Sequence, residues 1–399
     1  MDHHPICRWS AVLCLGLGSA GLFGCAGDSD ASAVQRTDSA GVEIVLSGST
    51  DRVLEWQFRR LFELGGADDG PESFYRVAPL LVGADSAGNL YVLDSPNARV
   101  VVFDAEGRFL RSMGSRGGGP GEFRSPATIS VSSDGEVAVF DYAKGDLVRF
   151  AADGTVRDEK PLHLFPTPTP NVQRHFSHFH DTTLVASSTS PMEPGDLIQT
   201  LRQIVGSDTL VLAELTLPPA KLTTFEECGV GIPLQPVFVQ ELAWATQPGM
   251  VAFDFTGEYS VSFIEAGRVT RMVRRDIEPT SASREQAISN RSEGFTVGIG
   301  GSECKIDADE LVDESGYAAT IPLISTLFLG PSGELWVQRF TVDREAIKPI
   351  DVFDPSGAYV GTLVTDSFAP VILLPGGRVG VVEGDEDDVQ RLVVLSIQR

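Results

Sequence analysis

Three of the six histidines lie close together and are the first candidates for chemistry. They occur in the stretch His175-Phe-Ser-His178-Phe-His180. On a β-strand, His178 and His180 would share one face and His175 would point to the other, because successive side chains alternate. Histidine nitrogen is a common metal ligand, so His178 and His180 are candidate ligands. The alternative is that they are polar residues at the start of a strand or at the mouth of a channel.

Acidic side chains offer a second kind of site. Asp94, Asp141 and Asp254 each follow a short apolar run, and Ca²⁺ takes carboxylate ligands. A short carboxylate at the end of a strand can instead accept backbone N–H bonds in the following turn. The acidic run 307–314 lacks the glycine turn of an EF-hand loop, so we expect a solvated loop there. Residues 384–388 predict an acidic hairpin turn.

The chain as a whole is strongly acidic. It has 31 Lys and Arg residues against 55 Asp and Glu residues, a formal net charge of −24. Such a surface repels nucleic-acid phosphates and is compatible with cations or basic partners, although solubility alone would explain it. The sequence contains no P-loop, no Gly-x-Ser-x-Gly elbow and no His-Glu-x-x-His motif. We therefore expect neither nucleic acid as a partner nor one of these catalytic machineries.

The first 24 residues have the pattern of a secretory signal peptide. An apolar run covers residues 9–23, shorter than the roughly 20 residues that a spanning helix needs, and it fits the apolar core of a signal peptide. Leu22-Phe23-Gly24-Cys25 resembles a lipobox, the bacterial signal for lipid attachment at Cys25, with Phe23 where a small residue is usual. The alternative is an ordinary signal peptide in which Cys25 has no role.

Residues 25–41 are small and polar, and they predict a lipidated, flexible tether. In the sorting rule of bacterial lipoproteins, an aspartate just after the lipid-bearing cysteine retains the protein in the inner membrane. Ala26 stands there instead. The resemblance therefore implies a chain anchored through Cys25 in the cell envelope, on the periplasmic side, and favours the outer membrane.

The cysteines are compatible with export. Cys7 and Cys14 would leave with the signal peptide, and Cys25 would carry the lipid. Cys228 and Cys304 remain as an even pair in an oxidising compartment. We predict a disulfide between them, and the alternative is two separate buried thiols.

The elements that must position these groups repeat along residues 42–399. Gly88, Asp94, Phe103 and Gly107 recur at one constant offset as Gly135, Asp141, Phe150 and Gly154. A fixed period of roughly 40 to 50 residues with several strands per unit is typical of a β-propeller blade. Within the first unit, Leu90 and Val92 alternate with Asn89 and Tyr91, which predicts a strand with one buried face.

These residues resemble the NHL-type repeat, in which an apolar strand and a glycine turn precede Val-x-Asp and a second strand ends in Phe-Asp. The glycine-rich stretch 114–123 is similar to the link between blades in that family. The resemblance is clear over residues 79–154. It implies an all-β, six-bladed β-propeller lipoprotein of bacterial type.

We expect the six blades to follow one another along the chain, each with about four strands. An N-terminal strand would close the last blade and remove its open edge, and both Val42–Leu46 and Val53–Phe58 are assigned to that role. Residues 276–318 break the pattern and predict a short, partly helical insertion, with Ser283 and Gln286 as a capping box. Excursions of this kind often carry binding function.

The leading hypothesis is a monomeric, membrane-anchored and non-catalytic propeller, without a cofactor, that presents one face to an envelope protein or glycan. The first alternative resembles the lactonase and arylesterase propellers, which hold Ca²⁺ in the central channel through Glu, Asn and Asp. Asp94, Asp141 and Asp254 are the acids that this alternative could use, and turn capping explains at least the first two. A third possibility is a sensor or an assembly accessory.

Overall fold

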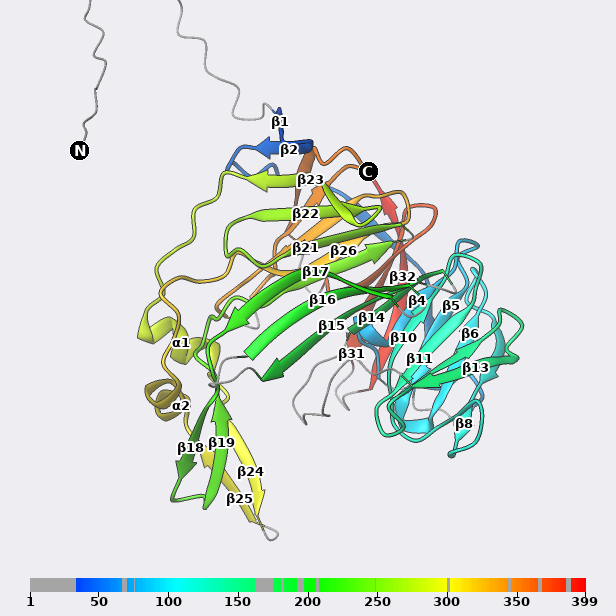
Figure 1. Ribbon diagram of the computed structural model, residues 1–399, viewed down its shortest axis with the longest axis horizontal. Coiled ribbons are helices and arrows are strands. Elements are labelled where there is room, and N and C mark those ends of the chain that lie inside the picture. Colours follow the sequence, from blue (N-terminus) through cyan, green and yellow to red (C-terminus); the bar gives the residue numbers. More distant parts are fainter. Residues whose placement is uncertain are drawn as a thin grey trace, which may run out of the picture.

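The computed structural model describes residues 34–66, 70–74, 76–161, 175–180, 183–191, 197–205, 208–247, 249–299, 302–343, 346–364, 368–384 and 389–399. In this part of the chain nearly every element is a β-strand, and the two α-helices are short. The larger sheets are arranged as the blades of a propeller (Figure 1).

Each blade contains four consecutive antiparallel strands, except that the last takes its fourth strand from the N-terminal segment. Blade one comprises β4 (Val82–Ala84), β5 (Leu90–Asp94), β6 (Arg99–Phe103) and β7 (Phe109–Met113). Blade two comprises β10 (Pro126–Val131), β11 (Val137–Asp141), β12 (Asp146–Phe150) and β13 (Val156–Pro161). Blade three comprises β14 (His175–His180), β15 (Thr183–Pro191), β16 (Leu197–Val205) and β17 (Asp208–Leu217).

The second half of the ring follows the same order. Blade four comprises β20 (Ala243–Gln247), β21 (Met250–Asp254), β22 (Ser260–Glu265) and β23 (Arg268–Arg275). Blade five comprises β26 (Ile324–Leu329), β27 (Leu335–Arg339), β28 (Ile350–Phe353) and β29 (Tyr359–Leu363). Blade six comprises β30 (Pro370–Leu374), β31 (Arg378–Gly384), β32 (Gln390–Gln398) and β3 (Gln57–Leu64). The link after blade one contains a short parallel pair, β8 (Ser115–Arg116) and β9 (Glu122–Phe123).

The six blades close into a ring. The first strand of each blade lies beside the first strand of the next, in the order β4, β10, β14, β20, β26 and β30, and β30 lies beside β4. An apolar cluster fills each of the six interfaces between neighbouring blades. The predicted all-β, six-bladed propeller is therefore confirmed.

Apolar side chains on both faces of a blade hold the ring together. In β5, Leu90 and Val92 pack toward blade six, whereas Tyr91 and Leu93 pack toward blade two. None of the four is more than 1% exposed. The prediction of one buried face in this strand was wrong, because every blade of a closed ring has a neighbour on each side.

The N-terminal segment runs along the outer edges of three blades. β1 (Gln35–Ser39) and β2 (Val42–Ser47) form a hairpin, and β2 pairs in parallel with β23 of blade four. The backbone N–H of Leu54 then donates to the Thr362 carbonyl in blade five. Finally, β3 pairs antiparallel with β32 and completes blade six. We call residues 35–64 the strap.

The predicted closure of the last blade by an N-terminal strand is confirmed for β3. It was wrong for Val42–Leu46, which extends blade four as part of β2. Val53–Phe58 overlaps β3 only at its C-terminal end. The outer strand of any blade leaves unpaired backbone groups, so a short apolar strand such as β2 fits more than one blade edge.

The strap is fixed by a buried ionic network between blades four and five. Asp351 and Arg275 are fully buried and contact each other at 3.1 Å, Oδ2 to Nη1. The Arg339 guanidinium donates to both oxygens of Asp351, and Asp51 of the strap pairs with both arginines. Tyr259 also donates its hydroxyl to Asp351, and burial together with this carboxylate raises the tyrosine pKa well above its usual value.

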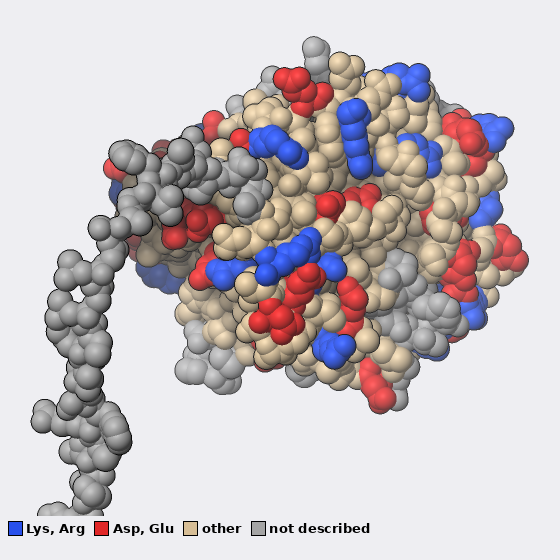
Figure 2. All heavy atoms as spheres, turned by 90° about the horizontal axis from the view of Figure 1, so that it is seen from above, with Lys and Arg blue, Asp and Glu red and all other residues tan. Residues whose placement is uncertain are grey.

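The network also satisfies backbone groups of the strap. Arg275 donates to the carbonyl oxygens of residues 48, 49 and 50, at 3.0 to 3.2 Å. Other charged side chains are interspersed at the surface, and Figure 2 shows both signs mixed over the face seen from above. One exposed pair is Arg284 with Asp313. Exposed pairs contribute about 0–1 kcal/mol, whereas a buried charge that loses its partner is costly.

Two excursions from the ring form what we call the annex, residues 218–239 and 276–323. The first carries the hairpin of β18 (Lys221–Phe225) and β19 (Val230–Leu234). The second carries α1 (Arg284–Asn290), the hairpin of β24 (Phe295–Ile299) and β25 (Ser302–Ile306), and α2 (Ala308–Ser315). Figure 1 shows both hairpins projecting from the blades beside the two helices.

The partly helical insertion near 276–318 is confirmed, including the capping box of Ser283 and Gln286 on α1. The acidic run 307–314 was predicted as a solvated loop, and this was wrong because most of it forms α2. Leu311 and Val312 are buried in the annex, while Asp313 and Glu314 stay exposed. The helix is stabilised by this apolar contact, which the acidic composition obscures.

Neither helix reaches the length of a membrane-spanning segment. They contain seven and eight residues, whereas a spanning helix needs about 20. Within the described residues no helix is long and apolar enough to cross a bilayer.

The first prediction concerns the ionic network. Asp351→Asn should lower the free energy of unfolding by about 3–5 kcal/mol, because it leaves the fully buried Arg275 and the partly buried Arg339 to share the single carboxylate of Asp51. The control Asp313→Asn breaks only the exposed pair with Arg284 and should cost about 1 kcal/mol or less. Urea unfolding followed by tryptophan fluorescence measures both variants. Equal, small losses would show that the network does not hold the strap.

Candidate functional site

The central channel of the ring contains a cavity of about 1300 Å³. Its walls come from the first strands of blades one, two, four, five and six. The lining extends from residues before these strands, such as Leu80 and Pro322, to turns after them, such as Ser133 and Gly333. The cavity therefore runs through the ring, and groups from several blades can reach one bound molecule.

The annex borders one mouth of this cavity. Residues 235–239 and Asn290 and Arg291 line it together with Phe340 from the loop after β27. Phe238 has a φ of 64°, a conformation that a bulky side chain rarely adopts and that costs of order 1–3 kcal/mol. Its ring packs edge-on against Phe340, with centroids 5.8 Å apart. The backbone at this mouth is thus held in an unusual conformation by packing.

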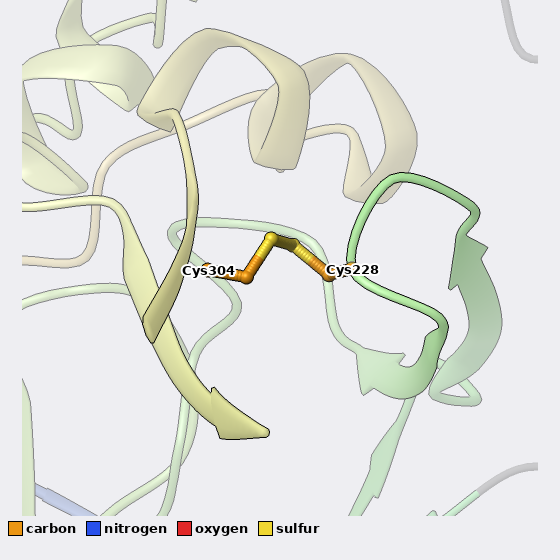
Figure 3. The surroundings of a disulfide bond; sticks show 2 residues. All are labelled: Cys228 and Cys304. Atoms are coloured by element: carbon orange, nitrogen blue, oxygen red, sulfur yellow. A yellow bond between two sulfur atoms is a disulfide. The ribbon is translucent and has the colours of Figure 1, made fainter. Parts of the chain in front are cut away.

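A disulfide joins the two excursions of the annex. Cys228, in the turn between β18 and β19, is bonded to Cys304 of β25, with the two Cα atoms 5.6 Å apart (Figure 3). This is the predicted pair. The two residues are separated by 76 positions, and closing a loop of that length can stabilise a fold by about 4–5 kcal/mol in the chain-entropy model. The bond therefore fixes the hairpins to each other beside the mouth.

Among the described residues that line the cavity, the charged ones are Asp85, Glu241 and Arg291. The Asp85 carboxylate accepts hydrogen bonds from Asn89 and from the hydroxyl of Tyr91, at 2.7 to 3.2 Å. Arg291 is the C-cap residue of α1, and its backbone N–H donates to carbonyl oxygens of the last helical turn. The walls are otherwise made of apolar, aromatic and small polar side chains.

Glu241 differs from the other two charged groups. Solvent reaches its side chain, but partial desolvation by the surrounding protein raises the pKa of its carboxyl group. Within the described part of the chain, no arginine or lysine pairs with it. Sequence reasoning missed Glu241. The available signal was its place just before β20, because residues that precede the first strand of a blade lie at one mouth of the channel.

Two of the predicted acids have structural roles. Asp94 accepts from Asn97 at 2.8 Å and from Arg99 at 3.0 Å. Asp141 accepts backbone N–H bonds from Arg124, Ser125 and Lys144, at 2.6 to 3.2 Å. Both carboxylates are buried, and neither lines the cavity. The turn-capping interpretation holds for Asp141, which accepts the backbone N–H of Lys144 in the following turn. It was wrong for Asp94, whose carboxylate is held by the side chains of Asn97 and Arg99 and makes no capping hydrogen bond.

Asp254, the third acid, is only partly satisfied. Its Oδ1 accepts from the backbone and hydroxyl of Thr256, but its buried Oδ2 has no partner among the described atoms. Burial raises the pKa of this carboxyl group to about 6. Asp254 ends the second strand of blade four and does not line the cavity. The structure thus does not bring Asp94, Asp141 and Asp254 together around the channel.

The other predicted site residues are placed only in part. β14 carries His175, His178 and His180 beside β10 in the ring, but their side chains lie outside the described residues. Cys25 and residues 385–388 also lie outside them. Among the described side chains, no three of His, Cys, Asp or Glu come close enough to hold a metal ion.

Comparison with known proteins agrees on the fold. A family model described as a 6-bladed beta-propeller matches residues 84–190. A member of the duf4221 family from Bacteroides vulgatus is similar in structure, with a TM-score of 0.54 and 10% identity, covering 86% of this chain and 98% of that chain. A search of curated proteins finds no match.

Two further solved structures are more distant. One is regucalcin, a calcium-binding protein from Agrobacterium tumefaciens, with a TM-score of 0.37, 11% identity and coverage of 88% of this chain and 94% of that chain. The other is a gluconolactonase from Xanthomonas campestris, with a TM-score of 0.36, 11% identity and coverage of 91% and 100%. At these scores neither says anything about the activity of this chain.

The second prediction concerns Asp254. A carboxyl group with a folded pKa near 6 and an ordinary value of 3.8 destabilises the fold once it is charged. The wild type should therefore lose stability as the pH rises from about 4 to about 6. Asp254→Asn, which cannot ionise, should be about 1–3 kcal/mol more stable than wild type at pH 7.5, and this advantage should vanish near pH 4.

Urea unfolding at several pH values measures this difference. Asp153→Asn is the control, since the Thr155 hydroxyl and backbone N–H lower the pKa of that exposed turn carboxyl. Its substitution should give no stabilisation at neutral pH. If Asp254→Asn instead destabilises the protein at neutral pH and this loss shrinks toward pH 4, the Asp254 carboxylate is charged and paired with a cation.

Proposed function

We propose that the protein is an exported, lipid-anchored and non-catalytic binding module of the cell envelope. In this proposal the propeller takes up part of an envelope protein or glycan at the channel mouth beside the annex. The observation that supports it is the cavity of about 1300 Å³ through the ring. Pockets for bound molecules are typically about 300–1,000 Å³ with mixed apolar and polar walls, so this cavity can hold a side chain or several sugar units.

Three features of the mouth favour binding there. The Cys228–Cys304 disulfide fixes the annex next to it, the strained Phe238 lies in its wall, and a partner can contact ring and annex at once. Backbone strain is concentrated at binding sites in many proteins. A rigid site also binds with a smaller loss of conformational entropy than a flexible one.

The N-terminal pattern supplies the location in this proposal. The apolar run 9–23, the lipobox-like Leu22–Cys25 and the NHL-type repeat support an exported lipoprotein. Ala26 favours the outer membrane. The predicted tether, residues 25–41, overlaps β1 (Gln35–Ser39), so the strap takes its C-terminal part. The polar residues before β1 would let the ring reach partners on the periplasmic side.

The third prediction tests where the ligand binds. A photo-crosslinking amino acid at Ser325, an exposed residue of β26 that lines the cavity, should capture an envelope component in living cells. The same replacement at Ser112, exposed on the outer strand of blade one, is the matched control and should capture much less. Gel shifts and mass spectrometry identify the product. Capture at Ser112 alone, or calcium-dependent lactone hydrolysis by the purified protein, would contradict the proposal.

The fourth prediction tests the anchor. Cys25→Ser should abolish incorporation of labelled palmitate and move the protein from the membrane fraction to the soluble fraction, because no lipid then holds the chain. Cys14→Ser is the control and should leave both unchanged. A Cys25→Ser protein that still carries the label would show that Cys25 is not the attachment site.

A further inference from the structure

The outer edge of blade three is open along the part of the chain that the structure describes. β17 is the outermost strand of this blade and, with ten residues, the longest of the described strands. It pairs with β16 on one side, with a bulge at Leu212, and no described strand pairs with its other side. Every second residue of an edge strand directs its backbone N–H and C=O groups away from the sheet. β17 therefore presents a row of donors and acceptors that another strand can complete.

The strap shows how the same kind of edge is filled in the other half of the ring. It adds β2 to the outer strand of blade four in parallel, and it adds β3 to blade six antiparallel. Between them, the backbone of residues 52–54 bonds to Thr362 in the outer strand of blade five. None of the described strap pairs with blade one, two or three. The outer edges of this ring thus accept an extended segment in either direction.

Apart from the bulge at Leu212, β17 lacks the features that keep an exposed edge strand from pairing, such as short length, lysine or proline. The outer strand of blade two, β13, contains two basic residues and ends in proline, and that of blade one, β7, has five residues including an arginine. β17 contains no Lys, Arg or Pro. Leu210 and Val211 are 48% and 47% exposed, and as neighbours on a strand they point to opposite faces. A strand added here meets apolar surface on both faces.

Charge favours another protein over a second copy of the chain as the occupant of this edge. The two charged residues of β17, Asp208 and Glu214, are both acidic. A second copy that paired antiparallel about Val211 would place Asp208 opposite Glu214, and like charges directly opposite are destabilising. Arg202 of β16 interacts electrostatically with Glu214, but the three charges together are still negative. The formal net charge of −24 on each copy adds to the repulsion, so a basic partner fits better.

We propose that the outer edge of blade three, along β17, binds an extended segment of another protein as a fifth strand. The backbone of the segment pairs with β17, as happens when peptides add to the edge of a sheet. Apolar side chains of the segment pack beside Leu210 and Val211, and its basic residues complement the acidic charges of Asp208 and Glu214. This surface lies on the outside of the ring, and it does not rest on the function proposed for the channel.

The fifth prediction uses a defined peptide on the purified chain. The probe is fluorescent Lys-Thr-Val-Thr-Val-Thr-Val-Lys, and anisotropy measures its binding. A version that is N-methylated at the Thr and Val residues keeps the side chains and the charge but loses those backbone donors, so it should bind at least about 10-fold more weakly. A version with glutamate at both ends should lose a similar factor. The bound probe should slow hydrogen exchange in residues 208–217 and leave exchange in β7 unchanged.

A matched pair of substitutions tests the edge itself. Leu210→Lys places a protective residue on β17 and should weaken binding of the probe at least about 10-fold. Leu110→Lys is the control, since Leu110 is 44% exposed on β7, the outer strand of blade one. It should leave binding of the probe unchanged. Equal melting temperatures verify that both variants are folded.

Four results would overturn the strand-addition site. The probe does not bind, or its N-methylated version binds equally well, in which case no added strand forms. Exchange in residues 208–217 stays unchanged while the probe is bound, which places the probe elsewhere. Sedimentation shows a dimer that Leu210→Lys abolishes, which assigns the edge to a second copy. Capture at Ser325 is a separate measurement, so failure here leaves the proposed function of the channel standing.

Discussion

The structure depends on the fact that no blade can bury its own faces. Each four-stranded sheet has apolar residues on both sides, as Leu90 and Tyr91 show in neighbouring positions of β5, and it becomes stable only between two other blades. Six such contacts close the ring. Inside the closed ring, the first strands of the blades line a channel. Side chains that face this channel are not covered by a neighbouring blade, so they can contact a bound molecule.

The strap makes closure depend on the two ends of the chain. β3 supplies the outer strand of blade six, while the residues before it run along blades five and four. The buried pair of Arg275 and Asp351 fixes this path, because Arg275 also pairs with Asp51 and donates to the carbonyl oxygens of residues 48–50. Buried ion pairs are a weak source of stability but can select one arrangement. Here that arrangement is the path of the strap.

The sequence predicted the features that are local and repeated along the chain. Its predictions failed where contacts between residues that are distant in the sequence determine the structure. Gly88 and Gly135 both have positive φ in equivalent turns, and Asp94 and Asp141 both end the second strand of their blades, so spacing alone identified the blades. Val42–Leu46 was misplaced because a parallel edge pairing leaves no local signal. The acidic residues of α2 concealed a helix held by Leu311 and Val312. Tyr91 is buried by its contact with blade two, and the sequence of β5 alone does not reveal this contact.

The candidate site was the hardest part to predict, because its groups come from blades and annex that meet only in the folded ring. Residue type favoured Asp94, Asp141 and Asp254 as site residues, yet the carboxylates of the first two already accept hydrogen bonds from other groups of the ring. Glu241 has no motif around it. What distinguishes it is its position in the channel wall, close along the chain to Phe238, which is held at positive φ. The Phe238 ring is only 6% exposed and packs with Val312 and Phe340 in the annex. The apolar core of the annex thus holds the positive φ at this position and sets the shape of the channel mouth, which is why no local pattern in the sequence could reveal it.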